Sequence, residues 1–487
     1  MRTRLTADFV LGFDGRGHVL FRNGEVVIEG TRIVHAGGAF AGEADRTFSF
    51  GRALIGPGFI DLDALGDIDS TVLTFEAGDE RAQGRVWTEA YLRAGPTDAF
   101  TRAENIGKFR HAFAGLIRNG ITTAMPITSM TYRAWAESPD EMAGVAAIAA
   151  ELGLRCYLGP CVMSGLTYQQ ADGSLARHTD PERAARGLAG ARRFIADHDG
   201  AAGGLVRGAL LPDRIETCTD DLLDGLAAIQ RETGVPLRIH CCQSVYEVET
   251  VLAERGVTSL GLLERHGLLG PKAVLPHGIY LSGHPLVSRQ GDEDIARLAA
   301  SGATVVHCPV VFARDGEALV SFGRYQMLGI NLALGTDTHP PDLVDTMRQG
   351  VSIARIVEGR RDAARAAEFY NAATLGGARA LGRDDLGRLS PGAQADLTVF
   401  DLSAFHLGPI VDPVKTMLLA GTGRDFVASF IAGRMVMAEG KVLGVDERAL
   451  GEEADRLMAK LMAHHVARAP GSPTLPELFP PVLPVAG

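Results

Sequence analysis

The chain has 487 residues and a formal net charge of −11 at pH 7, with 46% hydrophobic and 22% charged residues. The composition is typical of a globular protein. The chain is longer than a domain with one ordinary hydrophobic core, and its length suits a large domain with a smaller one. The charge is negative, and the sequence has no Lys/Arg-rich run and no apolar stretch long enough to cross a bilayer. We therefore expect neither nucleic acid nor a membrane as a partner.

Residues 1–56 predict one part of a small β-domain, because glycines divide them into short strands. The start of the chain has no extended apolar core and no small-residue cleavage site, so we expect no signal peptide. The six cysteines are scattered, and Cys241 and Cys242 fall within an apparent core strand. This pattern suits a reducing compartment better than a disulfide framework, and we therefore expect a cytoplasmic protein.

Residues 57–389 alternate short apolar runs with helical stretches rich in Ala, Leu and Arg, which is typical of βαβ units. Helices are predicted over 105–118, 140–152, 221–232 and 292–300. The apolar runs predict eight strands: Phe59–Ala64, Thr122–Ile127, Arg155–Val162, Leu205–Leu211, Pro236–Cys242, Ala273–Gly278, Ala303–Cys308 and Ile330–Gly335. Eight strands in this alternation predict an α/β fold, a (β/α)8 TIM-like barrel that forms the catalytic domain.

After residue 390 the pattern of strands and turns returns, so residues 390–445 are predicted to complete the small domain as a β-sandwich formed from both chain ends. The last part, 446–487, is predicted to hold one helix over 446–468 and a proline-rich tail. The prolines predict a tail without regular structure, either loose or docked as an arm on a neighbouring copy. We expect a homo-oligomer.

Polar residues follow the predicted strands at the end where active sites of such barrels lie. They are Asp61, Asp63, Asp67, His240, Gln243, His277, His307 and Asp337. Imidazoles and carboxylates that converge on one barrel mouth are suitable ligands for zinc, cobalt, manganese or iron.

Several motifs along the chain resemble those of one known family: PGFIDLDAL, RIHCCQS, LLGPKAVLPHGIYLS, VVHCPVV, LALGTDT and NAATLGGARALGRDDLGRLSPGAQADLTVFDL. Together they resemble the amidohydrolase superfamily, in the branch of triazine hydrolases and cytosine/guanine-type deaminases. The resemblance covers nearly the whole chain. It implies a barrel with a metal site at its mouth and a small molecule as the substrate.

Two positions depart from that family pattern. The family has His-x-His at the end of the first strand, where this chain has Asp63 and Leu65. Leu cannot bind a metal, whereas Asp63 still offers a carboxylate oxygen. Gln243 stands where deaminases of this branch carry a glutamate that shuttles a proton, and Gln cannot do so near neutral pH. The altered first-strand motif is similar to that of the phenylurea and molinate hydrolases.

The resemblance implies one divalent metal ion per chain, with zinc as the first choice and cobalt, manganese or iron as alternatives. His240, His277 and Asp337 are the expected ligands, and Asp63 or water completes the shell. Asp67 is an alternative ligand, although it is better interpreted as a loop carboxylate. Asp337 and His277 are also expected to act in catalysis, with Gln243 contacting the substrate.

Hydrolysis of an amide, urea or carbamate needs no protonation of an aromatic ring, so Gln243 favours a hydrolase that cleaves such a C–N bond with metal-activated water. A deaminase or dechlorinase of a nitrogen heterocycle is the alternative, with another acid in place of the missing glutamate. An alternative of a different class is a metal-free pseudoenzyme or binding protein. The missing His-x-His motif favours this alternative.

Overall fold

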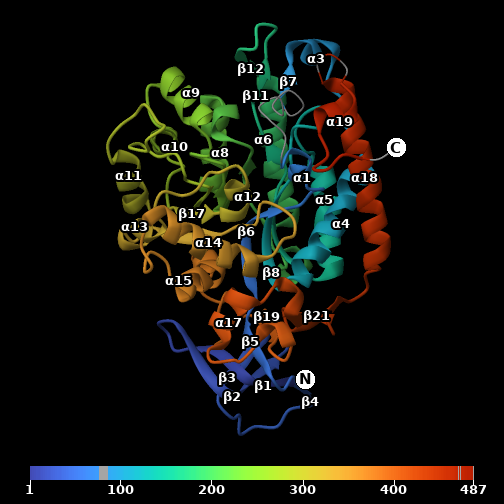
Figure 1. Cartoon of the computed structure of the whole chain (residues 1–487), viewed down its shortest axis with the longest axis vertical. Helices are drawn as coiled ribbons and strands as arrows, with labels where there is room; N and C mark the ends of the chain where they lie inside the picture. Colours follow the sequence, from blue (N-terminus) through green and yellow to red (C-terminus); the bar gives the residue numbers. More distant parts are fainter. Residues whose placement is uncertain (76–85, 470, 472, 486–487) are drawn as a thin grey trace.

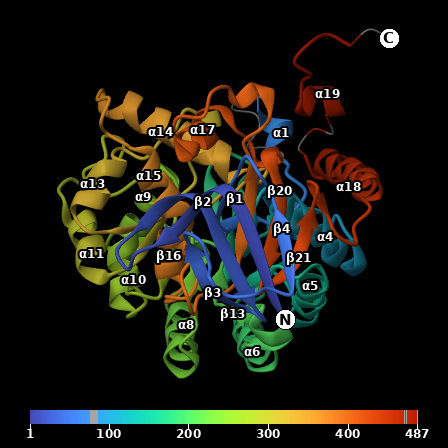
Figure 2. The same ribbon diagram turned by 90° about the horizontal axis from the view of Figure 1, so that it is seen from below.

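The computed structural model describes residues 1–487 except 76–85, 470, 472 and 486–487. Figure 1 shows a small β-sheet that carries the N-terminus, a larger α/β body above it, and the long helix α18 (Glu447–Arg468) along one side. Seen from the side of the small sheet, helices surround the body as an outer layer (Figure 2). Among the described residues, no helix is long and apolar enough to cross a membrane.

The centre of the body is an eight-stranded parallel sheet, and each of its strands overlaps one of the eight predicted strands, although several are shorter than predicted. In spatial order they are β13 (Val206–Gly208), β9 (Arg155–Leu158), β8 (Ile121–Ile127), β6 (Phe59–Leu65), β18 (Asn331–Leu334), β17 (Thr304–His307), β16 (Ala273–Pro276) and β15 (Leu237–Arg238). Leu210, just after β13, donates its N–H to Pro236 O and accepts from Arg238 N, both at 2.9 Å. These bonds join the two outer strands and are consistent with a TIM-like barrel.

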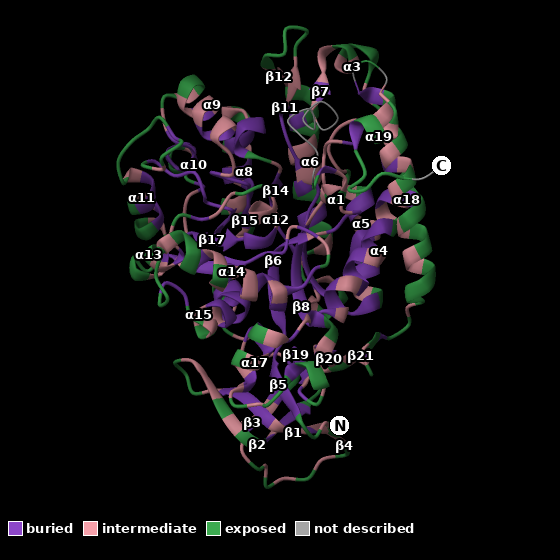
Figure 3. Ribbon diagram, in the orientation of Figure 1, coloured by how far each residue is buried: buried purple, intermediate pink, exposed green. Residues whose placement is uncertain are grey.

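Helices connect consecutive strands and cover the outside of this sheet, as the alternation in the sequence predicts. They include α4 (Arg102–Arg118), α5 (Pro139–Leu152), α6 (Pro181–His198), α8 (Asp220–Thr233), α9 (Val245–Arg255), α10 (Ser259–Arg265), α11 (Glu293–Ser301), α12 (Pro309–Arg314), α13 (Phe322–Met327), α14 (Leu343–Glu358) and α15 (Ala366–Asn371). Many begin at a side chain that caps the first turn; Thr101 and Ser138 accept from the N–H groups of Glu104 and Glu141. Their inner faces are buried and their outer faces exposed (Figure 3).

The small domain draws strands from both ends of the chain, as predicted. Its strands are β1 (Arg2–Phe13), β2 (His18–Glu29), β3 (Arg32–Gly37), β4 (Arg46–Ser49), β5 (Ala53–Pro57), β19 (Leu397–Asp401), β20 (Phe426–Ile431), β21 (Arg434–Ala438) and β22 (Lys441–Val442). The N-terminal β5 pairs with the C-terminal β19, so the hydrogen bonds form one continuous sheet. The predicted β-sandwich is therefore not confirmed.

The prediction that the proline-rich C-terminal tail lacks regular structure is wrong. The short helix α19 (Leu475–Leu478) lies within it. Pro476 occupies the first turn of this helix, where the missing N–H of proline costs no hydrogen bond. Leu478 and Phe479 are buried together with Ala469 beside α18.

A second, three-stranded sheet lies above the carboxyl ends of the barrel strands and was not predicted. It contains β7 (Trp87–Thr88), β11 (Gly165–Gln169) and β12 (Leu175–Thr179), and it lies at the end of the molecule opposite the small domain (Figure 1). It encloses the barrel mouth, since Trp87, Leu166 and Thr167 line the cavity found there.

A buried ion pair joins the barrel to the small domain. Arg155, on β9, donates from Nε to Asp396 Oδ2 at 2.7 Å and from Nη2 to Oδ1 at 3.1 Å. Both side chains are only 3% exposed. We expect Arg155→Ala to lower the free energy of unfolding by about 3–5 kcal/mol, because it leaves the Asp396 carboxylate buried without its partner.

Urea denaturation measures this loss. The control is Arg207→Ala, which removes a partly exposed pair with Asp199 and is expected to cost less than about 1 kcal/mol. Equal losses in the two variants would show that the Arg155 pair has no special role in holding the two parts together.

Candidate functional site

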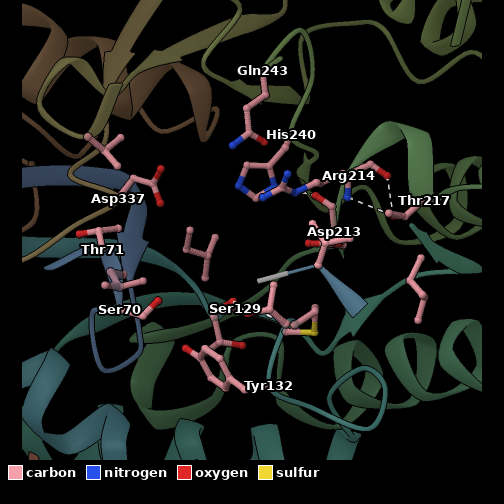
Figure 4. A pocket seen from close by; sticks show the side chains of 18 of the residues that line it. Ser70, Thr71, Ser129, Tyr132, Asp213, Arg214, Thr217, His240, Gln243 and Asp337 are labelled. Atoms are coloured by element: carbon pink, nitrogen blue, oxygen red, sulfur yellow. Dashed lines mark hydrogen bonds between the residues drawn. The ribbon is translucent and has the colours of Figure 1, made fainter. Parts of the chain in front are cut away.

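A cavity of about 490 Å³ opens at the carboxyl ends of the barrel strands. This volume is within the range of pockets that bind drug-sized molecules. Figure 4 shows His240, Gln243, Arg214, Asp213 and Asp337 around it. Its other walls carry apolar and aromatic side chains: Leu65, Ile68, Trp87, Ile127, Met130, Tyr132, Met163, Leu166, Val311 and Phe312.

Three of the predicted ligand residues, Asp63, His240 and His277, form one buried group, of which His240 lines this cavity. Asp63 Oδ1 lies 3.7 Å from His240 Nε2, and Asp63 Oδ2 lies 3.9 Å from His277 Nε2. The potential ligand atoms of all three residues lie within 4.8 Å of one another. Asp337 lines the same cavity but stands outside this three-residue group.

The backbone around Asp63 is shaped to bring this carboxylate inward. The pairing of β6 with β8 shifts register between Asp61 and Ala64, which interrupts the regular alternation of faces along the strand. Gly335 faces Asp63, and a Cβ at this glycine would come within 2.6 Å of the Asp63 Cβ. Only glycine therefore allows the two strands to approach so closely here.

The histidines of the group are held as neutral rings with a free nitrogen. His240 Nδ1 lies 2.6 Å from the carbonyl oxygen of Asp213, to which it donates, so that Nε2 keeps its lone pair. Burial, together with the charges of Arg238 and Arg214, lowers the pKa of His240 to about 3. Burial also lowers the pKa of His277 well below its ordinary value, and neither nitrogen of this buried ring has a hydrogen-bond partner.

Two residues of the site have strained backbones. His277 has φ 76° and Asp337 has φ 49°, a region that residues other than glycine rarely adopt. The Asp337 N–H donates to Asp63 O at 2.9 Å, which fixes the turn that presents the Asp337 side chain. Such strain is concentrated at functional sites, where the surrounding structure holds residues in position.

Arg238 is a fixed cation beneath the group. Its Nη1 donates to the carbonyl oxygens of Met125 and Pro126, both at 3.1 Å, and lies 3.5 Å from Asp63 Oδ1. Burial raises the pKa of Asp63 to about 7, and the Arg238 charge opposes that rise. Burial and the neighbouring Asp63 raise the pKa of Asp337 well above its ordinary value.

These residues fit a divalent metal ion. Asp63 Oδ1 and both ring nitrogens of His277 are buried without a hydrogen-bond partner, and His240 Nε2 faces the same carboxylate. Buried polar atoms are normally satisfied, and a carboxylate with two neutral imidazoles is a donor set that zinc and similar ions take. A cation there would also offset the cost of burying the carboxylates.

The remaining predicted residues have different surroundings. Asp67 is not a ligand candidate, because its Oδ1 forms a fully buried ion pair of 2.8 Å with Lys108 Nζ. Asp61 accepts from the hydroxyl and the N–H of Thr336, so its carboxylate is already satisfied. His307 packs against the rings of Phe322 and Phe369.

Gln243 lines the cavity, and its contact with a substrate stays a prediction. Its side-chain Oε1 is buried without a hydrogen-bond partner, and its backbone N–H donates to Glu247 Oε2 at 2.7 Å. The amide is therefore available to a bound molecule.

Sequence reasoning missed the loop after the fourth strand, which places Asp213, Arg214 and Glu216 on the cavity. Glu216 is buried with Oε2 unpartnered, and burial followed by the charge of Glu247 raises its pKa to about 8. The signal was present as three charged residues within LLPDRIETC, directly after a predicted strand.

A sequence profile of the Amidohydrolase family matches residues 107–442. A 5-methylthioadenosine/S-adenosylhomocysteine deaminase of Natronomonas pharaonis is 30% identical over 444 residues, which cover 90% of this chain and 93% of that protein.

Two solved structures share the fold. A zinc-bound adenosine deaminase of Xanthomonas campestris has a TM-score of 0.76 and 22% identity, covering 95% of this chain and 98% of that one. A zinc-bound atrazine chlorohydrolase of Arthrobacter aurescens has a TM-score of 0.76 and 19% identity, covering 94% of this chain and 100% of that one.

These relatives confirm the predicted family and the prediction of an enzyme, in place of a metal-free binding protein. They favour the alternative reaction, on a nitrogen heterocycle, over the amide, urea or carbamate hydrolysis that Gln243 suggested.

Proposed function

The chain belongs to the amidohydrolase family, and on this premise we propose that it hydrolyses the bond between a ring carbon and an exocyclic amino group of a nitrogen heterocycle. Water replaces the amino group, so that the ring gains a carbonyl and ammonia leaves. The 490 Å³ cavity has room for such a ring and its substituents.

One observation carries the proposal: Asp63, His240 and His277 bring their ligand atoms together in one buried group, and His240 of this group lines the cavity. These residues would hold one divalent ion, and zinc is the first choice. A divalent ion at such a site acidifies water and polarises the group under attack. His240 would keep the orientation set by its bond to the Asp213 carbonyl.

Asp337 is the proposed proton acceptor. It lines the cavity beside the ligand group, and its backbone is fixed by the bond to Asp63 O. In the reaction its carboxylate takes a proton from the attacking water and passes it toward the departing nitrogen.

Glu216 is the proposed donor of the proton that the ring nitrogen needs, a role that Gln243 cannot perform. Its carboxyl lines the cavity, and its Oε2 has no hydrogen-bond partner among the residues that the structure describes. With a pKa raised to about 8 by burial, it holds its proton near neutral pH. Gln243 would then bind the ring through its unpartnered amide oxygen.

Hydrolysis of an amide, urea or carbamate is the second candidate, and Gln243 is the observation that favours it. This reaction needs no proton on an aromatic ring, so Asp337 and the metal site would suffice.

A substrate panel separates the two candidates. Aminopyrimidines, aminopurines and purine nucleosides report deamination as ammonia, whereas anilides and N-aryl carbamates report the second reaction as an aniline. We expect ammonia release from at least one heterocycle and no aniline. Release of aniline without ammonia would reject the deaminase proposal and support the second candidate.

A further inference from the structure

Arg214 is a rigidly held residue whose side chain projects into the cavity. The backbone N–H of Arg214 donates to Thr217 Oγ1 at 3.3 Å, and its backbone carbonyl oxygen accepts from that hydroxyl at 2.7 Å. The backbone of Arg214 also pairs with that of His240. The residues that follow, Ile215 and Glu216, are buried, whereas Arg214 is exposed to the cavity. Figure 4 shows the Arg214 side chain extending toward the ring of His240.

Within the part of the chain that the structure describes, the Arg214 guanidinium forms no hydrogen bond and no ion pair. The other deep cations differ, because Arg238 is held by two carbonyl oxygens and Lys108 by the Asp67 carboxylate. An arginine beside the ligand group whose N–H donors are unused is suited to bind an anion from outside.

Carboxyl groups lie around Arg214 without pairing with it. Asp213, Glu216 and Asp337 line the same cavity, but among the described residues no hydrogen bond or ion pair joins any of them to the guanidinium. For Arg214 itself burial opposes the charge, but the surrounding carboxyls hold its pKa above the ordinary value. The cavity therefore contains a permanent positive charge close to His240.

We propose that Arg214 anchors a carboxylate of the substrate. Resting on the proposed function, this assigns the substrate class: an amino-substituted nitrogen heterocycle with a carboxylate near the reacting carbon. The planar guanidinium presents paired N–H donors that match the two oxygens of a carboxylate. The apolar wall formed by Met163, Leu166 and Phe312 would contact the faces of the ring.

Binding of unreactive probes tests the anchor without requiring turnover. The probes are pyrimidine-5-carboxylate and its neutral isostere 5-acetylpyrimidine, neither of which has an amino group to lose. In titration calorimetry of the wild type we expect the carboxylate to bind about 10- to 100-fold more tightly, the range for a hydrogen bond to a charged group. Arg214→Gln should remove this preference and leave 5-acetylpyrimidine binding unchanged, and Arg214→Lys should restore part of it.

The control is Arg186→Gln, an exposed arginine of α6 whose loss should change neither affinity. Thermal unfolding of each variant verifies that it is folded. Equal affinity of the wild type for the two probes would overturn the proposal. A carboxylate preference that survives in Arg214→Gln would also overturn it, because the anion would then be held elsewhere.

The anchor and the proposed reaction can fail separately. Ammonia release from 4-aminopyrimidine-5-carboxylate is compared with release from 4-aminopyrimidine. We expect a higher kcat/KM for the carboxylate in the wild type, and we expect Arg214→Gln to abolish this difference. Probe binding that depends on Arg214, without ammonia from any heterocycle, would support the anchor and reject deamination. Ammonia release that is indifferent to the carboxylate would reject the anchor alone.

Discussion

Replacing Asp337 with asparagine is expected to lower kcat by a factor of about a thousand, within the range for a general acid–base residue. The amide keeps the size and the backbone turn of Asp337 but cannot accept a proton from the attacking water. Because Asp337 stands outside the group formed by Asp63, His240 and His277, the metal content of the variant should stay close to that of the wild type.

Steady-state kinetics and elemental analysis of the same preparation test this prediction together. Asp315→Asn is the control, since Asp315 also lines the cavity and has no assigned role in proton transfer. A variant with unchanged kcat would show that Asp337 does not move the proton. Loss of the metal together with activity would assign Asp337 as a ligand, as the sequence had predicted.

Glu216→Gln should lower kcat for a heterocyclic amine by a factor of about a hundred or more, because the variant cannot protonate the ring nitrogen. The pH profile gives a second readout. The acid form of Glu216 exists below its raised pKa of about 8, so the step that it serves weakens as the pH rises through that value. The decrease in rate as the pH rises through about 8 should therefore be absent from the residual activity of the variant.

Glu254→Gln is a matched control, since Glu254 pairs with Arg177 outside the cavity, and it should keep the wild-type rate and profile. If Glu216→Gln deaminates as fast as the wild type, the proton comes from another group and the loop after the fourth strand has no part in the chemistry.

The arrangement of the strands could be predicted from the sequence because each strand is a short apolar run between two amphipathic helices. The polar residues that end such runs meet at one edge of a parallel sheet. This rule alone places His240 and His277 together. The family motifs add Asp63, although the sequence does not indicate the register shift between Asp61 and Ala64.

Contacts between segments distant in the sequence could not be predicted in this way. Asp67 was a candidate ligand until the structure placed Lys108 of α4 against it. The side chains of Arg214 and Glu216 face the cavity because of the turn after the fourth strand, and a list of charged residues does not reveal such a turn. The short helix α19 formed in a proline-rich tail because its proline lies in the first turn.

The metal content of the purified protein, dialysed without chelator and measured by elemental mass spectrometry, tests the central claim most directly. We predict about one divalent ion per chain in the wild type and less than about a tenth in His240→Ala, because the three-residue group loses a ligand. A wild-type content below about a tenth, with no recovery after zinc, cobalt or manganese is added, would contradict the claim that this site holds a metal.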